Sequence, residues 1–256
     1  GGCGFIGTSL IKKIIAINPQ AHIRVLDNLQ IGKRDDLKKV SIYKEIKFNE
    51  INLKPGVYLL VSDIRDFDKC LHASKDIDCI VHLAANTGVG PSVENPRLDM
   101  ETNIIGIFNM LESARKNKVN QFVFASSGAP AGLVEPPIHE ELAAHPVSPY
   151  GASKLAGEGY CSCYHLTYKV NTVSLRFGNV FGPGSKNKYS IVSKFIRQAL
   201  LGETCQIYGD GTQTRDFIYV DDLIDAILLA SEFVGCEVFQ IASGAELTIN
   251  ELVEKL

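Results

Sequence analysis

Short apolar runs alternate with amphipathic segments along the first 178 residues, and this alternation constrains the fold more than any other feature. The runs are rich in β-branched residues and apolar through most of their length, as in strands that are buried on both faces. They cover residues 22–27, 57–62, 78–83, 121–125 and 172–177, and the amphipathic segments cover 8–17, 65–73, 98–116 and 150–168. Alternating strands and helices predict an α/β fold with a doubly wound parallel sheet.

The pattern changes after residue 178. Residues 179–190 are rich in Gly, Asn, Lys and Ser and predict a loop. Beyond it we expect a helix over 191–201, a short strand near 205–208, a turn at 209–212 and a helix over 220–233. The chain is therefore expected to divide into a nucleotide-binding domain, 1–178, and a smaller C-terminal lobe, 179–256. No linker separates the two, so they are expected to share one cleft.

The chain opens on Gly-Gly-Cys-Gly-Phe-Ile-Gly, in which Gly1, Gly4 and Gly7 recur every third residue. This spacing permits a tight turn and close backbone approach to a pyrophosphate, and the following helix N-terminus favours negative charge. An ordinary glycine-rich turn would show the same spacing. Asp27, however, ends the next predicted strand, where a carboxylate accepts hydrogen bonds from adenosine ribose hydroxyls and repels a 2′-phosphate. Together these features predict a Rossmann-type unit that binds NAD rather than NADP.

A doubly wound sheet carries a central strand before its glycine loop, and the sequence has none before Gly1. We therefore expect that the sequence is trimmed at its N-terminus and that the nucleotide-binding domain lacks its first strand. The smaller lobe ends at Leu256, inside a predicted helix, and is expected to be incomplete at its C-terminus.

Tyr150-Gly-Ala-Ser-Lys154 opens an amphipathic segment, and positions i and i+4 share one helix face. The Lys154 ammonium is expected to favour the phenolate and to lower the pKa of Tyr150 from about 10, which makes a general base near neutral pH. A surface Tyr and Lys one turn apart would look the same. A predicted strand ends in Ser126 and Ser127, at the sheet edge where ligands bind, although a turn or cap also uses serines. The glycine loop, Ser127, Tyr150 and Lys154 together predict one catalytic site.

Composition limits the other classes of function. Lys plus Arg is 26 and Asp plus Glu is 29, and the net charge of −3 disfavours a basic surface for nucleic acid. No apolar run approaches the roughly 20 residues of a membrane span. The seven cysteines are scattered, and no Cys and His cluster completes a zinc site. We therefore expect no metal, and reduced thiols in a cytoplasmic protein.

These motifs, in this order, resemble the extended short-chain dehydrogenases/reductases, and among them the NAD-dependent sugar-nucleotide epimerases and dehydratases. The resemblance runs over essentially all 256 residues. Besides the glycine loop and the Ser, Tyr and Lys, it is carried by residues 25–29, 63–65, 82–85, 101–106, 175–183 and 209–217.

The resemblance implies a role for each matching residue. The implied catalytic residues are Ser127, Tyr150 and Lys154. The implied NAD contacts are Gly1, Gly4, Phe5, Ile6, Gly7, Asp27, Asn28, Asp63, Ile64, Leu83, Ala84, Ala85, Thr102, Ser126, Tyr150, Lys154 and Phe177. The implied substrate contacts are Thr87, Ser127, Asn179, Gln206, Tyr208 and Arg215. A guanidinium such as that of Arg215 suits a diphosphate, although a structurally paired Arg, and an edge strand at Gln206 and Tyr208, are the alternatives.

The implied reaction is epimerisation of a nucleotide-diphosphate sugar, most simply a UDP-hexose at C4. Tyr150, assisted by Ser127 and Lys154, takes a proton from a sugar hydroxyl while hydride passes to tightly held NAD. The keto-sugar then rotates and receives the hydride on its other face. The alternatives are another sugar-nucleotide oxidoreductase or dehydratase, and a non-catalytic NAD-binding sensor.

Three departures from the family pattern bear on this choice. Gly-Ala-Pro follows Ser127, where dehydratases usually carry Asp-Glu, so dehydration is disfavoured. Residues 130–132 are Pro-Ala-Gly where the family usually has Val-Tyr-Gly, and Thr87 stands where well-known galactose epimerases have Lys. Both changes lie near the sugar and leave its identity open.

The resemblance also implies a homodimer in which the helices over 98–116 and 150–168 pair with those of a second copy. Ile104, Phe108 and Leu111 have the helical spacing of such a face, although the same stripe could pack inward. The expected partners are therefore a nucleotide sugar and a second copy, with neither nucleic acid nor membrane.

Overall fold

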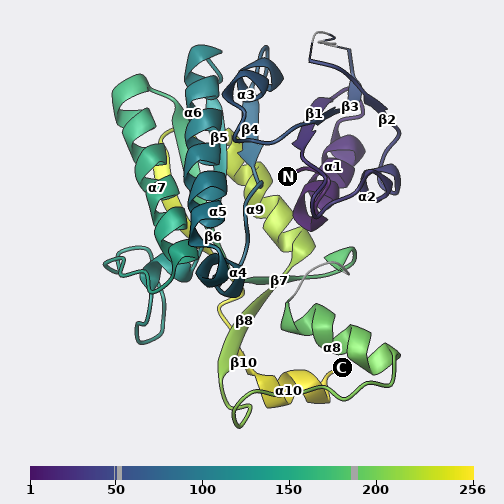
Figure 1. Ribbon diagram of the computed structural model, residues 1–256, viewed down its shortest axis with the longest axis vertical. Helices are drawn as coiled ribbons and strands as arrows, with labels where there is room; N and C mark the ends of the chain where they lie inside the picture. The colour runs from purple at the N-terminus through teal and green to yellow at the C-terminus, as the bar shows by residue number, and fades with distance from the viewer. Residues whose placement is uncertain (49, 51–53, 186–189) are drawn as a thin grey trace.

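The computed structural model describes residues 1–48, 50, 54–185 and 190–256 of the chain. Figure 1 shows strands flanked by helices in the upper part of the molecule and a smaller group of strands and helices below them. Two of the three sheets are wholly parallel, which confirms the predicted α/β fold class.

The larger parallel sheet has the order β4-β5-β6-β9 and the smaller one the order β1-β3-β2. The larger consists of β4 (Cys79–His82), β5 (Gln121–Ser127), β6 (Asn171–Phe177) and β9 (Cys236–Ile241). The smaller consists of β1 (His22–Asp27), β2 (Tyr43–Glu45) and β3 (Gly56–Val61). The five strands predicted in the first 178 residues are all present, with ends that differ from the prediction by at most two residues.

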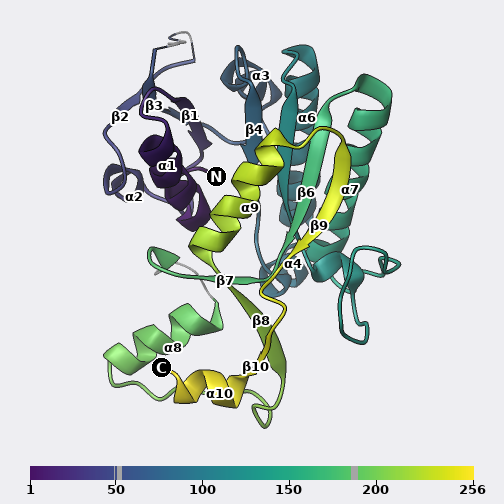
Figure 2. The same cartoon turned by 180° about the vertical axis from the view of Figure 1, so that it is seen from behind.

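Helices cover both faces of the larger sheet. One face carries α3 (Phe67–Ala73), α5 (Pro96–Met100), α6 (Gly106–Lys116) and α7 (Pro149–Tyr168), and the other carries α9 (Val220–Glu232) with α1 (Phe5–Ile17) packed beside it. The short helices α2 (Arg34–Lys38) and α4 (Val89–Glu94) lie in connections. Figure 2 shows α9 crossing the sheet, with α6 and α7 on the far side.

Strand β5 shows why the sheet needs cover on both faces. Phe122 and Phe124 are buried in the same cluster as Ile107 of α6, whereas Val123 between them is buried with Leu223 of α9. Alternate side chains of a strand point to opposite faces, so an uninterrupted apolar strand requires apolar neighbours above and below.

The segment predicted as one helix over 98–116 changes its pitch. Helix α5 leads into a π-helical turn, Glu101–Ile105, and then into α6. Such turns are rare and frequently mark functional sites. Of the residues predicted on a dimer face, Phe108 is 38% exposed, but Leu111 is fully buried and packs inward instead. The homodimer stays a prediction.

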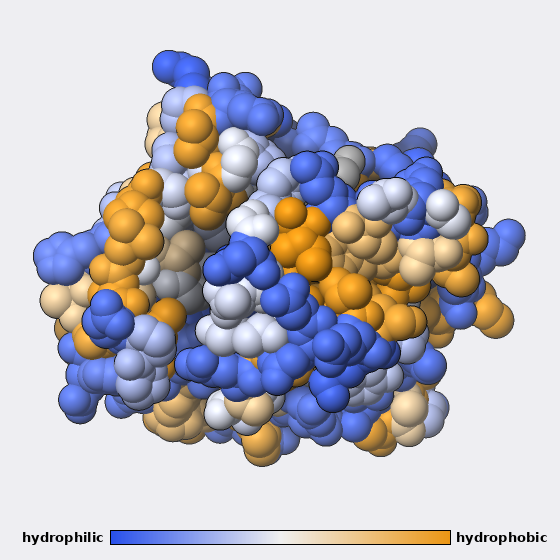
Figure 3. Space-filling view, turned by 90° about the horizontal axis from the view of Figure 1, so that it is seen from below, coloured by the Kyte–Doolittle hydropathy of each residue, from blue (hydrophilic) through white to orange (hydrophobic). Residues whose placement is uncertain are grey.

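The lower part of the molecule contains a mixed sheet and two helices. Strand β8 (Thr214–Tyr219) pairs parallel with β7 (Asn179–Phe181) and antiparallel with β10 (Glu246–Thr248). Helices α8 (Ile191–Leu200) and α10 (Ile249–Glu254) complete it. Figure 3 shows this lower face, on which apolar side chains are interspersed among hydrophilic ones. Exposed apolar residues of α8 and the segment after it include Ile196, Leu200 and Leu201.

Several expectations for the second half are wrong. Residues 179–181 form β7 rather than a loop, and 186–189 of that predicted loop lie outside the described residues. Residues 205–208 are not a strand: they follow α8 as irregular chain, held by a bond from Gln213 Nε2 to the Tyr208 carbonyl (2.8 Å). Helix α10 ends at Glu254, two residues before Leu256.

The lobe expected over 179–256 contributes to both parts of the molecule. Strand β9 pairs parallel with β6, and α9 packs against β4, β5 and β6. Both elements therefore belong to the larger sheet and its cover, while β7, β8, β10, α8 and α10 form the lower part. Strand β9 escaped prediction because its sequence, Cys-Glu-Val-Phe-Gln-Ile, lacks the fully apolar pattern of a central strand.

A cavity of about 550 Å³ lies between β1 and β4, which are not hydrogen-bonded to each other among the described strands. Residues 21–26 line one side and residues 76–84 the other, together with Gly1, Gly2 and Gly7 of the glycine loop. This is the position expected for a strand that precedes a glycine loop in a doubly wound sheet. That strand stays a prediction.

Helix α7 packs against the larger sheet through Gly157. A Cβ at this position would lie 2.5 Å from Phe124 Cζ and 3.1 Å from Ile107 Cδ1, whereas a Cβ at Gly159 of the same helix would meet nothing within 4 Å. Overpacking of a core usually costs about 1–3 kcal/mol. We therefore expect Gly157→Ala to lower the free energy of unfolding, measured in urea, by that amount.

The control for this prediction is Gly159→Ala, which adds the same methyl group to an open position of α7. Alanine stabilises a helix interior by about 0.5–1 kcal/mol relative to glycine, so this variant should be as stable as the parent or more so. Equal effects of the two substitutions would contradict the packing described for Gly157.

Candidate active site

Strand β5 and helix α7 bring the three predicted catalytic residues to the carboxyl end of the larger sheet. Ser127 is the last residue of β5, and Tyr150 and Lys154 lie one turn apart at the start of α7. The Ser148 side chain caps this helix by accepting a hydrogen bond from Gly151 N at 3.1 Å. The cap fixes where α7 begins, and therefore which face its first turn presents to Ser127.

The ammonium of Lys154 is buried beneath Tyr150. The residue is 4% exposed, and its Nζ donates a hydrogen bond to the Ala125 carbonyl at 2.7 Å. The same atom lies 4.9 Å from the centroid of the Phe124 ring and 5.7 Å from that of Tyr150. Burial lowers the pKa of Lys154 to about 8, because a charged ammonium is disfavoured away from water.

Burial raises the pKa of Tyr150 above its usual value, while a hydrogen bond with the Ser127 side chain lowers it. The sequence predicted the opposite net direction, a phenol made more acidic by Lys154. The difference arises because the phenol is desolvated as well as placed near a cation. Lys154 Nζ nevertheless lies 5.7 Å from the centroid of the Tyr150 ring, so a charge on one residue bears on the protonation of the other.

A buried ion pair lies one helical turn beyond Lys154. Arg176 donates from Nε and Nη2 to the two carboxylate oxygens of Glu158, at 2.9 and 2.8 Å, and both side chains are 6% exposed. Ser126 Oγ donates to Glu158 Oε1 at 2.5 Å. Ser126, implied as an NAD contact, therefore points toward α7. The three residues join β5, β6 and α7, the elements that carry the catalytic residues.

The glycine loop approaches other backbone so closely that only glycine fits at two positions. A Cβ on Gly1 would lie 2.5 Å from Ala84 N, and one on Gly7 would lie 2.6 Å from Gly2 Cα. A Cβ on Gly4 would have only Gly1 O near it, at 3.3 Å. Gly4 precedes the first residue of α1, whose N-terminus has no side-chain cap. An open backbone cradle at a helix N-terminus fits a pyrophosphate.

Asp27 is tied to the backbone around it. Its Oδ2 accepts from Cys3 N at 2.9 Å and its Oδ1 accepts from Leu29 N at 2.8 Å. The residue is only 7% exposed. Asp27 therefore holds the glycine loop to the end of β1, a role that the sequence did not predict. A carboxylate has further lone pairs, so contact with ribose hydroxyls stays a prediction.

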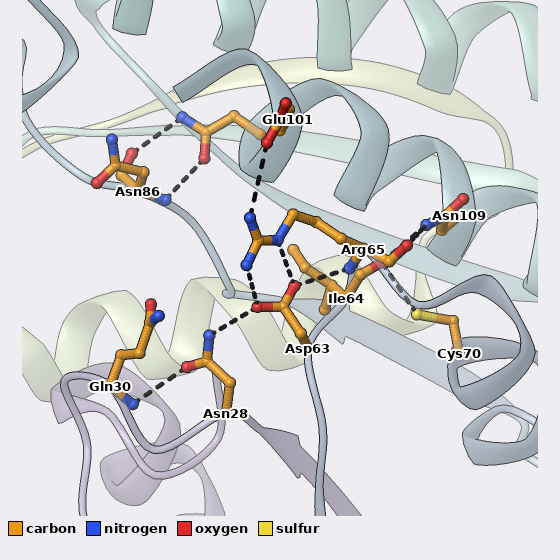
Figure 4. A network of polar contacts seen from close by, with 10 residues as sticks. Asn28, Gln30, Asp63, Ile64, Arg65, Cys70, Asn86, Glu101 and Asn109 are labelled. Carbon is orange, nitrogen blue, oxygen red and sulfur yellow. Dashed lines mark hydrogen bonds and ion pairs between the residues drawn. The ribbon is translucent and has the colours of Figure 1, made fainter. Parts of the chain in front are cut away.

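Asp63 lies in the polar network of Figure 4, which joins the ends of β1 and β3 to the π turn. Arg65 binds its carboxylate from Nε and Nη2, both at 2.9 Å, and Asn28 Nδ2 donates to it at 3.1 Å. The pairing with Arg65 lowers the pKa of Asp63 to about 2. Arg65 Nη1 also lies 3.7 Å from Glu101. Ile64 is buried in the core, and its implied contact with NAD stays a prediction.

Asn103, in the π turn, holds the segment that follows β4. Its Oδ1 accepts from Asn86 N at 2.8 Å and its Nδ2 donates to Asn86 O at 2.9 Å. The same Nδ2 lies 2.9 Å from Asp99 Oδ1 and 3.1 Å from Ser153 Oγ. Leu83, Ala84 and Ala85, implied NAD contacts, lie in this held segment and are half-buried, as is Thr102 beside Asn103.

The implied substrate contacts come from both parts of the molecule. Thr87 is exposed in the segment after β4, and Asn179 is exposed at the start of β7, where its Nδ2 donates to Asp216 O at 3.1 Å. Arg215 is exposed on β8 and bonds only its neighbour, the Thr214 carbonyl, among the described residues. Gln206 and Tyr208 are exposed after α8. Phe177 ends β6 as the Cα partner of Ser127.

Sequence reasoning missed four buried polar residues, Asp99, Asn103, Glu158 and Arg176. A signal was present for two of them. Tyr150, Lys154 and Glu158 recur every fourth residue and so share one face of α7. Arg176 stands in an otherwise apolar strand, where a charge needs a buried partner. Asp99 gave no signal. Asn103 lies within the matching segment 101–106, but its buried contacts could not be predicted, because the π turn that positions it is invisible to a 3.6-residue period.

The described residues give no sign of a membrane span or of a metal site. No helix among them is long and apolar enough to cross a membrane. They also contain no group of three or more His, Cys, Asp or Glu side chains placed to hold a metal ion.

Comparison with known proteins places this site in context. The profile of the NAD dependent epimerase/dehydratase family matches residues 1–242. A putative UDP-glucose 4-epimerase of Methanocaldococcus jannaschii is 37% identical over 260 residues, which span 99% of this chain and 79% of the relative. The structure of a UDP-glucose 4-epimerase from Thermotoga maritima with UDP-glucose is similar with a TM-score of 0.88, at 32% identity, covering 99% of this chain and 79% of that one.

A dehydratase is similar as well. The structure of the dTDP-glucose 4,6-dehydratase DesIV from Streptomyces venezuelae, with NAD bound, has a TM-score of 0.86 and 29% identity, and covers 100% of this chain and 78% of its own. The comparisons therefore include both reaction types of one family of enzymes.

The Arg65 contact yields a prediction about Asp63. Because Arg65 lowers the pKa of this carboxyl to about 2, Arg65→Met should raise it toward the usual 3.8, which a carboxyl NMR titration measures. The arginine favours the charged form, so the stabilising contribution is present above the ordinary pKa and is lost as pH falls toward 2. Arg97→Met is the control, because Arg97 pairs with Glu101 and not with Asp63. An unchanged Asp63 titration in Arg65→Met would contradict the contact.

Proposed function

This chain belongs to the NAD dependent epimerase/dehydratase family, and from that premise we propose that it epimerises a nucleotide-diphosphate sugar, a UDP-hexose at C4, with NAD as its bound cofactor. The observation that carries the proposal is the meeting of Ser127, Tyr150 and Lys154 at the carboxyl end of the larger sheet. Similar proteins named as UDP-glucose 4-epimerases support the choice of sugar and reaction.

Tyr150 is proposed to take the proton from the sugar hydroxyl that becomes a ketone. A phenolate is the acceptor, and the buried ammonium of Lys154 stabilises it electrostatically across the 5.7 Å between Nζ and the ring centroid. The Ser127 side chain lies close enough to Tyr150 to lower the pKa of the phenol, and its hydroxyl is proposed to orient both the phenol and the sugar hydroxyl. After the keto-sugar has rotated in the site, the same phenol returns the proton, so the protein ends each cycle in its starting state.

The glycine loop fits the pyrophosphate of NAD, because the space at Gly4 is open and the N-terminus of α1 favours negative charge. Gly4 and the first turn of α1 would hold the pyrophosphate, and Asn28 and Asp63 would lie on the adenosine side. When bound, NAD supplies an acceptor and donor of hydride at the sugar carbon. Asp27 carries negative charge at the end of β1, and this disfavours the additional 2′-phosphate of NADP.

Dehydration is the alternative in the same family, and the loop after Ser127 disfavours it. Residues 128–130 are Gly-Ala-Pro, and Ala129–Ala131 form one turn of 3-10 helix whose Pro130 and Ala131 are buried. This turn offers no carboxylate next to Ser127 to expel water from the sugar. An epimerase needs no such acid, because no carbon–oxygen bond of the sugar is broken. In the lower part of the molecule, Asn179 and Arg215 are proposed to hold the nucleotide diphosphate.

A direct assay separates these reactions. The purified full-length protein is mixed with UDP-glucose, UDP-galactose, or their N-acetyl and uronic forms, without added NAD, and products are separated by chromatography. We expect interconversion of one C4 pair without net formation of NADH. Stoichiometric NADH would instead identify a dehydrogenase, and a product lighter by one water would identify a dehydratase.

Removal of the Tyr150 hydroxyl tests the proposed base. Tyr150→Phe should lower kcat by about 10²–10⁴-fold, the usual contribution of a general base, while binding of the nucleotide sugar changes little. Tyr160→Phe is the matched control, because Tyr160 lies on the same helix but is 36% exposed and packs edge-on against Phe108. Full activity of Tyr150→Phe would contradict the mechanism.

A further inference from the structure

The buried ammonium of Lys154 needs a counter-charge, and neither its hydrogen-bond acceptor nor the aromatic ring beside it supplies one. It bonds the Ala125 carbonyl and faces the Phe124 ring, and neither carries a negative charge. Taking an isolated ammonium out of water is costly unless a carboxylate compensates it. Two carboxylates, those of Asp99 and Glu158, act on Lys154 electrostatically.

Glu158 is already neutralised. Both of its oxygens accept hydrogen bonds from Arg176, and one also accepts from Ser126. A bidentate, buried pair with its own arginine presents no net charge to Lys154. Glu158 therefore acts on the charge of Lys154 less strongly than Asp99 does, and mainly fixes the position of the catalytic turn of α7.

Asp99 is different, because no arginine or lysine forms an ion pair with it in the described part of the chain. The residue is 1% exposed. Its Oδ1 accepts from Asn103 Nδ2 at 2.9 Å, and its Oδ2 is buried without a hydrogen-bond partner among the described atoms. Such an atom is costly to bury and requires an explanation.

The network around Asp99 holds it against the catalytic helix. Asn103 Nδ2 reaches Ser153 Oγ at 3.1 Å, and Ser153 is the residue before Lys154. Helix α5, which carries Asp99, packs on α7. The π turn places Asn103 so that it joins α5, α7 and Asn86 after β4. The position of Asp99 is thus fixed by three other elements.

We propose that Asp99 is the buried counter-ion of the Tyr150–Lys154 pair, and that its charge sets the pH range over which that pair carries a phenolate beside an ammonium. Asp99 is a tuning residue, since it acts through Lys154 and Tyr150 and not on the sugar. The inference rests on the proposed use of Tyr150 as the base.

The electrostatic directions agree with this geometry. Asp99 raises the pKa of Lys154 against the lowering caused by burial, and it adds to the raised pKa of Tyr150. Burial in turn raises the pKa of Asp99, while the Ser153 hydroxyl and the Lys154 charge lower it. A negative charge favours the protonated form of both partners, so its removal lowers both of their pKa values.

The other groups that face Lys154 do not replace Asp99. His82, on β4, is buried between aromatic rings, and burial lowers its pKa to about 3, so it stays neutral. Arg176, on β6, already forms an ion pair with Glu158. Glu101, in the π turn, is engaged by Arg65 and Arg97.

The test compares pH profiles of two variants in the full-length protein. Asp99→Asn removes one buried negative charge and keeps the shape of the side chain. The control combines Glu158→Gln with Arg176→Met, which disturbs an equally buried contact of α7 but leaves the net charge unchanged. Asp99→Ser provides a second charge-removing variant should Asp99→Asn fold poorly. Thermal unfolding of each variant reports structural damage separately.

The pair titrates as a unit, and its active form lies between the fully protonated and fully deprotonated forms. We expect Asp99→Asn to move both limbs of the pH profile of kcat to lower pH by about 1 unit. The double variant Glu158→Gln, Arg176→Met should be less stable than the parent, but both limbs of its pH profile should stay in place. Limbs that stay in place in both Asp99 variants, with activity lowered at every pH, would overturn the proposal. Equal shifts in the control would overturn it too.

A titration without substrate separates this inference from the proposed function. Tyrosinate absorbance is followed against pH, and subtraction of the Tyr150→Phe background isolates Tyr150. The midpoint should fall by a similar amount in Asp99→Asn and stay in the control. Absence of turnover with every sugar nucleotide, together with this shift, would refute the function and keep the inference. Turnover with no shift in either readout would refute the inference alone.

Discussion

The ion pair between Glu158 and Arg176 is the interaction on which the rest of the site depends. It lies between α7 and the sheet, where both side chains are almost fully buried, and Ser126 adds a third contact from β5. Removing one partner of such a pair leaves an uncompensated buried charge, which lowers the free energy of unfolding by about 3–5 kcal/mol. The pair therefore specifies one placement of α7 over β5 and β6. Ser127, Tyr150 and Lys154 follow from that placement.

Burial and nearby charges together set the pKa values of the catalytic residues on α7. Tyr150 and Lys154 are taken out of water, which raises the pKa of the phenol and lowers that of the amine. One buried carboxylate beside them is neutralised by arginine and serves position. The other, Asp99, forms no ion pair with arginine or lysine among the described residues, and Asn103 of the π turn joins it to Ser153, the neighbour of Lys154. The same helix thus receives its geometry from one carboxylate and its electrostatics from another.

The sequence predicts much of this molecule, and the failures have physical reasons. Uninterrupted apolar strands such as β5 were found because burial on both faces leaves a direct compositional trace. The glycine loop was found because close backbone approach admits no side chain at Gly1 and Gly7. Strand β9 was missed because Glu237 and Gln240 interrupt its apolar run without giving a strict alternation, and residues 205–208 were misassigned because a short apolar run does not guarantee a neighbouring strand. The acidic residue at the end of β1, Asp27, was predicted from the sequence, but its hydrogen bonds from the backbone N–H groups of Cys3 and Leu29 were not.

The central claim is that one carbon of a nucleotide sugar loses and regains the same hydrogen within this site. The most direct measurement uses UDP-glucose that carries deuterium at C4, with the purified protein and no added NAD, and locates the label in the product by NMR. Epimerisation at C4 should yield UDP-galactose with the deuterium still at C4 and none in water. Deuterium in the solvent, or on another carbon of the sugar, would contradict it.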